Sequence, residues 1–208
     1  MKRITLCALF LTLFLLISCN TSGKNLTDDE VAKSDGTVID LAKITKNIKD
    51  SVAFANDVKD VHSLVKSIDT LAKAIGKKVQ NQDTLGTEAN HNGSLLAGAF
   101  SVATTIEVKV GELKIAESLK GLNEKVKDVG DKAQAFTAKL KSQHATLGAA
   151  NGATTDEHAK EAIDRNNGSK TKGAEELIAL NTAIDALLKA ANDAVTAAIN
   201  ELTTPAKP

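Results

Sequence analysis

Apolar side chains recur every three or four residues along most of the chain after residue 40, and this spacing places them on one face of an α-helix. Four such stripes are present, at 41–75, 96–113, 119–140 and 177–202. Gly76 follows the first stripe and is placed to end that helix. Because each stripe needs apolar partners, the pattern predicts an all-α fold, a bundle of four to five helices.

Three stretches interrupt or complicate this pattern. Residues 102–110 are rich in β-branched side chains and by propensity fit a strand, but their apolar spacing is helical and favours a helix. Gly121 predicts a break in the third stripe. The segment 77–94 is rich in Gly, Asn and Asp, which predicts a loop after the first long helix, with a short β-hairpin as an open alternative.

The C-terminal third contains signals for a short helix and a long one. Thr154 and Glu157 have the spacing of a capping box, which predicts a helix that begins there and ends near Ile163. The polar segment 165–173 predicts an exposed loop. The last helix is expected to run over 173–202.

The first eighteen residues have the layout of an export signal. Lys2 and Arg3 precede an apolar segment at 4–17. In a helix this segment reaches about 21 Å, short of the roughly 30 Å hydrocarbon core that a spanning helix crosses. The segment therefore indicates a signal peptide at 1–18 and not a permanent membrane anchor.

The signal ends in Leu16-Ile17-Ser18-Cys19, which resembles the lipobox of bacterial lipoproteins. Cleavage before Cys19 would leave an N-terminal cysteine that carries acyl chains, and two or more chains hold a protein stably on a bilayer. The alternative is that Cys19 is an ordinary thiol at the end of a signal peptide. The predicted organisation is a signal peptide at 1–18, a flexible tether at 19–37, the bundle at 38–202 and a tail at 203–208.

Composition excludes some functions once the signal is removed. Loss of Lys2 and Arg3 leaves a net formal charge of −2, so no global basic field attracts nucleic acid. The aromatic residues that remain are Phe54, Phe100 and Phe136, too few to stack on bases. Of the two cysteines only Cys19 remains, which rules out a disulfide within the mature chain and leaves stability to packing.

No catalytic, cofactor or metal site is predicted. His62 with Asp69, and His158 with Glu161, offer at most half of a metal site, and a third ligand at a telling spacing is missing. "GSKT" at 168–171 lacks the glycine spacing of a phosphate-binding loop. The sequence therefore favours a protein without enzymatic activity.

Four lysines in predicted loops form a candidate polyanion-binding surface: Lys77, Lys78, Lys170 and Lys172. Several cations that converge on one face attract sulfated polysaccharides such as glycosaminoglycans. Interspersed acidic residues support the alternative of a solvated surface of mixed charge.

Several runs resemble the variable small proteins and the outer surface protein C group of Borrelia spirochaetes. They are "AIGKKV" at 74–79, "NHNGSLLAGAF" at 90–100, "AKEAI" at 159–163, "TKGAEEL" at 171–177 and "ELTTPAKP" at 201–208. The outer surface protein C branch commonly has a further cysteine in the third helix, whereas "GDKAQAFT" at 130–137 has none. That difference favours the variable small protein branch.

The resemblance implies an elongated helical bundle, usually a homodimer, anchored through Cys19 in the outer membrane and facing outward. It also implies a major surface antigen, exchanged for other versions during infection, whose distal loops meet host antibodies. An adhesin that binds a host glycosaminoglycan or host protein through the lysines is the second hypothesis. A periplasmic enzyme or assembly factor is a third, disfavoured because no catalytic constellation is present.

Overall fold

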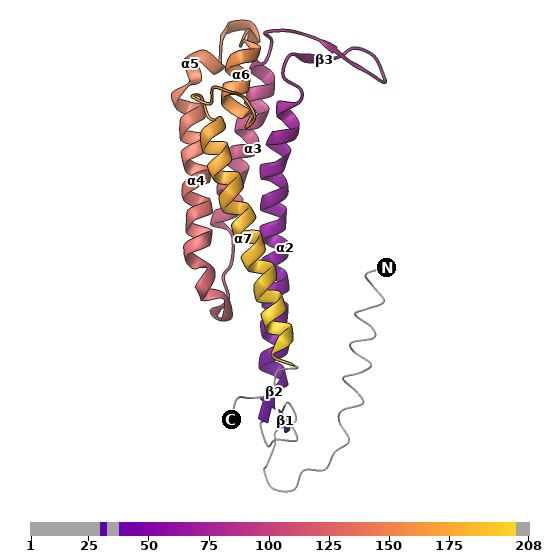
Figure 1. Ribbon diagram of the computed structural model, residues 1–208, viewed down its shortest axis with the longest axis vertical. Coiled ribbons are helices and arrows are strands. Elements are labelled where there is room, and N and C mark those ends of the chain that lie inside the picture. The colour runs from indigo at the N-terminus through magenta and orange to yellow at the C-terminus, as the bar shows by residue number, and fades with distance from the viewer. Residues whose placement is uncertain (1–29, 33–37, 203–208) are drawn as a thin grey trace. The chain divides into compact units, whose positions relative to one another are not determined.

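The computed structural model of the chain describes residues 30–32 and 38–202 (Figure 1). The chain divides into two compact units, one made of 1–49 with 198–208 and one made of 50–197. Six α-helices lie in the described residues: α2 (Leu41–Ala72), α3 (Gly93–Gly111), α4 (Asn123–Ser142), α5 (His144–Leu147), α6 (Asp156–Ile163) and α7 (Ala174–Asn200). The prediction of an all-α bundle is confirmed.

The first unit contains a small antiparallel sheet of strands β1 (Glu30–Ala32) and β2 (Val38–Asp40), in which Val31 lies opposite Ile39. Asp40 then caps α2, because its Oδ1 accepts the backbone N–H of Lys43 at 2.8 Å. Strand β1 lies inside the segment 19–37 expected to be a tether, so this part of it has local backbone pairing. The signal peptide, Cys19 and the tail at 203–208 lie outside the described residues.

The second unit is a helical bundle whose core is formed by the predicted apolar stripes. Its largest fully buried side chains come from α2, α3, α4, α6 and α7, and they are Phe54, Val58, Val61, Val65, Ile68, Ile106, Phe136, Ile163, Leu177, Leu180, Ile184 and Leu187. Burial of one such side chain contributes about 1.5–3 kcal/mol. Because four long stripes and one short helix share this core, the bundle needs no cross-link to hold it.

The helical spacing of 102–110 outweighs its β-branched propensity, whereas the glycine at 121 does interrupt the third stripe. Residues 102–110 lie inside α3, and the predicted break near Gly121 is present as the 3₁₀-helix η1 (Glu117–Leu122) before α4. By length and composition alone α3 could cross a membrane, but its stripe of Leu96, Ala99, Ala103, Ile106 and Val110 is buried in the bundle. Burial accounts for this stripe, while other apolar side chains of α3, such as Val108, remain exposed.

The segment after α2 does contain a hairpin. Strands β3 (Lys77–Val79) and β4 (Leu85–Thr87) pair antiparallel with Lys78 opposite Gly86. Figure 1 shows the hairpin projecting away from the helices. The side chain of Asn81 closes its turn, since Oδ1 accepts the backbone N–H groups of Asp83 and Thr84, each at 3.0 Å.

The predicted capping box is wrong by one residue. Thr155, and not Thr154, precedes α6, and its hydroxyl accepts the backbone N–H of His158 at 3.2 Å. Thr154 is buried, and its hydroxyl donates to the carbonyl of Leu147 at 2.8 Å. Either of the two adjacent threonines could cap the helix by residue type. Because the hydroxyl of Thr154 is used in the bond to Leu147, Thr155 is the cap.

A buried asparagine joins three segments at one end of the second unit. Asn92 is 2% exposed; its Oδ1 accepts the N–H of Gly76 at 2.9 Å and its Nδ2 donates to the Thr154 carbonyl at 3.0 Å. Nδ2 also donates to Oδ1 of Asp156 at 2.8 Å. Asn90 adds a reciprocal pair with Asp156, at 2.8 and 3.0 Å. The end of α2, the start of α3 and the start of α6 are thereby held together.

Replacement of Asn92 by Ala should lower the free energy of unfolding by about 1–3 kcal/mol, because the buried N–H of Gly76 loses its acceptor. Urea denaturation followed by circular dichroism measures this change. Asn166→Ala, at an exposed position in the α6–α7 segment, is the matched control and should change stability by less than about 0.5 kcal/mol. Equal losses in both variants would contradict the role assigned to Asn92.

Candidate functional site

Three exposed segments meet at one end of the second unit, and we call them together the loop end. They are 77–92 with the β3–β4 hairpin, 143–155 around α5 and the 3₁₀-helix η2 (Ala150–Gly152), and 164–173 between α6 and α7. Figure 1 places β3, α5 and α6 at this end. All four lysines of the predicted polyanion surface lie in it.

Lys77 and Lys78 lie on strand β3, and both are exposed. The ammonium of Lys78 is 2.6 Å from Oε2 of Glu88, just beyond β4. The hydrogen bond and the charge of Lys78 hold the pKa of Glu88 below its usual value. The cation of Lys78 is therefore balanced by its own hairpin, and Lys77 is the better placed of the two for an outside anion.

Lys170 and Lys172 lie in the α6–α7 segment and are partly buried. The Lys170 ammonium donates to the carbonyl of Asn167, and the Lys172 ammonium lies 2.5 Å from Oε2 of Glu161 on α6. Hydrogen bonds from Lys172 and Ser169 lower the pKa of Glu161. Lys172 is balanced in the same way as Lys78, so the four lysines are not a set of four free cations.

The α6–α7 segment is anchored at both of its ends. Arg165 forms a bidentate pair with Asp69 of α2, at 2.7 and 2.6 Å. Gly173, with a φ of 148°, enters the core: a Cβ there would lie 2.8 Å from the carbonyl oxygen of Ala162 and 3.0 Å from Cδ2 of Leu140. These anchors fix the path of the segment while its middle stays at the surface.

The half-site of His62 with Asp69 that was considered from sequence is not formed. Asp69 is engaged by Arg165, and His62 instead bonds Asp185 of α7 through Nε2 at 2.9 Å. Lys66 joins the same carboxylate at 3.2 Å. Among the described residues, no three His, Cys, Asp or Glu side chains are grouped to hold a metal ion. These polar groups tie α2 to α7.

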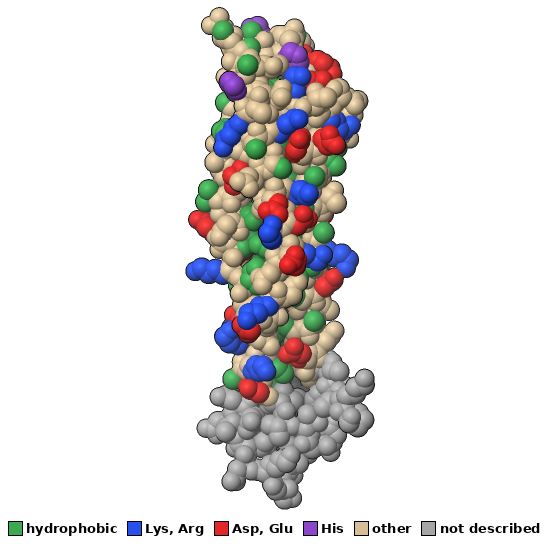
Figure 2. Space-filling model, turned by 90° about the vertical axis from the view of Figure 1, so that its left-hand side faces the viewer, with side chains coloured by type: hydrophobic (Ala, Val, Ile, Leu, Met, Phe, Trp, Pro, Cys, Tyr) green, Lys and Arg blue, Asp and Glu red, His purple; other side chains and the backbone are tan. Residues whose placement is uncertain are grey.

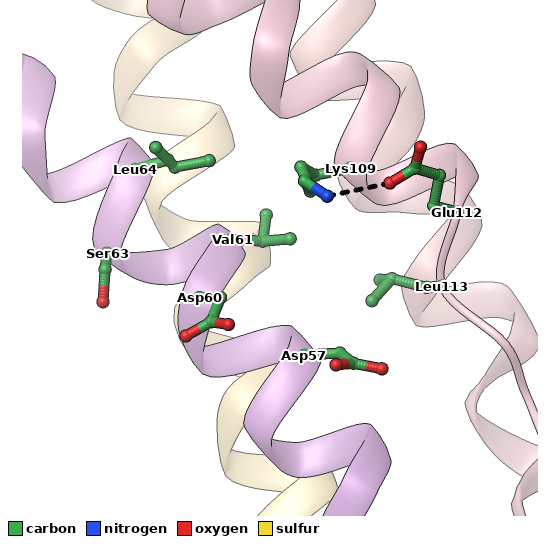
Figure 3. A pocket seen from close by; sticks show the side chains of 8 residues that line it. All are labelled: Asp57, Asp60, Val61, Ser63, Leu64, Lys109, Glu112 and Leu113. Carbon is green, nitrogen blue, oxygen red and sulfur yellow. Dashed lines mark hydrogen bonds and ion pairs between the residues drawn. The ribbon is translucent and has the colours of Figure 1, made fainter.

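An open groove of about 500 Å³ lies between α2 and α3 (Figure 3). Asp57 and Asp60 approach it from α2, and Lys109 pairs with Glu112 from α3 at 3.0 Å. That hydrogen bond, helped by the charges of Asp57 and Asp60, raises the pKa of Lys109. The groove offers an apolar wall and an acidic rim, and its lining contains no pairing of a nucleophile with a base.

Charges on the surface are mixed. The face shown in Figure 2 carries acidic and basic side chains interspersed along the helices. Several ion pairs join two side chains of the same helix, such as Lys127 with Asp131 at 2.5 Å and Lys189 with Asp193 at 2.7 Å. Exposed pairs of this kind contribute little stability, typically 0–1 kcal/mol. This face of the bundle therefore carries no large field of a single sign.

The chain is similar to known surface proteins over nearly its whole length. A family model described as a lipoprotein matches residues 38–208. Variable small protein 11 of Borrelia hermsii is 48% identical over 211 residues, covering 99% of this chain and 98% of that protein. Outer surface protein C of Borreliella burgdorferi is 45% identical over 212 residues, covering 99% and 96%.

A solved structure supports the same relationship. Variable small protein 1 of Borrelia turicatae is 53% identical and superposes with a TM-score of 0.70, covering 78% of this chain and 98% of that one. The fold and these matches define a lipoprotein class of helical surface proteins. The chain belongs to the family of the Borrelia variable small proteins and outer surface protein C, as the sequence motifs predicted.

Proposed function

We propose that the chain is a variable major surface antigen, anchored in the outer membrane by acyl chains on Cys19, that serves immune evasion by antigenic variation. The observation that carries the proposal is the match to variable small protein 11 over 99% of the chain. The loop end supports it, because exposed segments 77–92 and 164–173 are held by a few anchors while most of their side chains contact solvent. Host antibodies are the partners of such a surface, and no catalytic role is assigned.

The anchor is tested by its chemistry at Cys19. Cells labelled with radioactive palmitate should show a labelled product for the wild-type chain and none for Cys19→Ser. Cys7→Ser, which removes the other cysteine within the predicted signal, is the matched control and should keep the label. Proteinase K added to intact cells should degrade the wild-type protein and spare a periplasmic marker. A wild-type protein protected from the protease would overturn the outward-facing location.

We also propose that the antigen acts as a homodimer formed through helix surfaces. Large apolar side chains remain exposed on two long helices, with Val52 of α2 at 41% and Val108 of α3 at 54%. A second copy that covers these valines would remove their apolar surface from water, and a two-fold dimer brings the same helix surface of both copies together.

Val108→Glu should weaken self-association at least tenfold, because an acid in an apolar interface has to be desolvated. Analytical ultracentrifugation over a dilution series measures the dissociation constant. Ala135→Glu, at an exposed position of α4, is the control and should leave the constant unchanged. A wild-type protein that sediments as a monomer throughout the series would remove the dimer from the proposal.

A second candidate function is an adhesin that binds host glycosaminoglycan or a host protein through the lysines of the loop end. Lys77 favours it, since this cation is exposed on a projecting hairpin. The ion pairs of Lys78 and Lys172 limit the charge available. Retention on heparin is therefore expected at low salt and should fall steeply toward physiological ionic strength, where the Debye length is about 8 Å.

Replacement of Lys77, Lys78, Lys170 and Lys172 by Ala should abolish this heparin retention. Replacement of Lys125, Lys127, Lys132 and Lys189 removes the same number of charges from the helices and is the control. Glu88→Gln with Glu161→Gln should raise the salt concentration at elution, because Lys78 and Lys172 lose their acidic partners. Equal effects of the two quadruple variants would indicate a nonspecific charge effect and contradict the adhesin.

A further inference from the structure

A second groove, of about 250 Å³, lies between α3 and the α4–α5 corner of the loop end. Its floor is made of Leu96, Leu140 and Leu147, each of which is buried in the core. Phe100, partly exposed, forms one wall. Binding sites for drug-sized ligands typically have volumes of about 300–1,000 Å³, so a groove of this size suits a smaller molecule.

The groove is open because the residues along its edge are small. Ala97 on α3 is exposed, and Gly93 and Gly148 supply no side chain to cover the leucines. At Gly148 a Cβ would lie 2.8 Å from the carbonyl oxygen of His144, so a side chain there would need the backbone to shift. The apolar floor thus stays accessible from outside the bundle.

Both ionisable side chains that line this groove are basic ones, Lys141 and His144. The Lys141 ammonium lies 5.7 Å from the centroid of the Phe100 ring, a cation–π distance. The backbone of Lys141 orients the imidazole of His144, since Nδ1 of His144 donates to the carbonyl of Lys141 at 3.1 Å. Lys141 is in no ion pair with a carboxylate of the described residues. Its cation is therefore available, at the edge of an apolar surface.

We propose that this groove binds a small anionic amphiphile, a carboxylate on a short unbranched apolar chain. The chain would cover the three leucines and Phe100, and the carboxylate would accept a charge-assisted hydrogen bond from the Lys141 ammonium. A cationic amphiphile finds no acidic partner in the lining, and an extended polyanion finds too few charges. The site is separate from the four lysines considered for polyanions and does not depend on the antigen role.

The full chain in lipid nanodiscs can be tested with octanoate that carries a photoreactive diazirine near its methyl end. After illumination and proteolysis, mass spectrometry should place the label on peptides from 93–100 and 140–148. Localised labelling is informative even where the probe also enters the lipid. Excess octanoate should compete for this labelling, whereas octylammonium and octanol at the same concentration should not.

Two variants separate the apolar and the charged parts of the site. Ala97→Phe fills the groove from an exposed position, and Lys141→Glu reverses its charge. Each variant should reduce the local labelling roughly tenfold. Lys141→Glu removes one charge-assisted hydrogen bond, and Ala97→Phe removes apolar contacts of comparable free energy. Ala186→Phe and Lys125→Glu, at exposed positions of α7 and α4, are the matched controls. Far-ultraviolet circular dichroism confirms that each variant keeps its helix content.

Labelling at the groove that falls in both groove variants and in neither control supports the proposal. Labelling spread over the chain, or equal competition by octylammonium, would overturn it, because the groove would then select no charge. Labelling that survives Ala97→Phe would also overturn it, because the probe would lie elsewhere.

Discussion

The fold depends on the burial of one continuous apolar seam shared by α2, α3, α4, α6 and α7. Residues 50–197 contain no cysteine, so this packing holds the second unit without a disulfide. Small side chains such as Ala99, Ala103 and Ala133 lie in the seam beside Phe136 and Leu187, and they let the helices approach closely. A core of this kind imposes few requirements on the outward-facing residues, which suits the role proposed above.

At the end of the second unit, polar side chains hold the loops in place. Asn92 and the Arg165–Asp69 pair connect the loops to helices that lie far away in the chain, and they do so with directional hydrogen bonds. Loops without regular structure need such bonds, because their backbone N–H and C=O groups lack the regular hydrogen bonds of a helix or a sheet. The loop end is therefore held at a few points by directional bonds, and the charges of Lys78 and Lys172 are balanced there by Glu88 and Glu161.

Much of this architecture could be predicted from sequence, because helices, breaks and the hairpin follow from local spacing. The periodicity of 96–113 outweighed its β-branched residues, and Gly121 marked the η1 break. Contacts between distant positions could not be predicted: Asp69 and Arg165 are 96 residues apart, and no local pattern pairs them. The error at Thr154 has the same origin, since its bond to Leu147 is tertiary. The lysines could be found from the sequence, but the pairing of Lys78 with Glu88 and of Lys172 with Glu161 depends on how the chain folds back on itself.

Gly173 has a consequence for how the family can diversify. Its Cα packs so closely against Ala162 and Leu140 that an added methyl group has no room, and its φ of 148° disfavours any other residue. A side chain at 173 would displace the first turn of α7. The exposed positions of the preceding loop, Asn166, Gly168 and Thr171, meet no such obstacle, so sequence differences are accommodated at its crest and not at its entry into the helix.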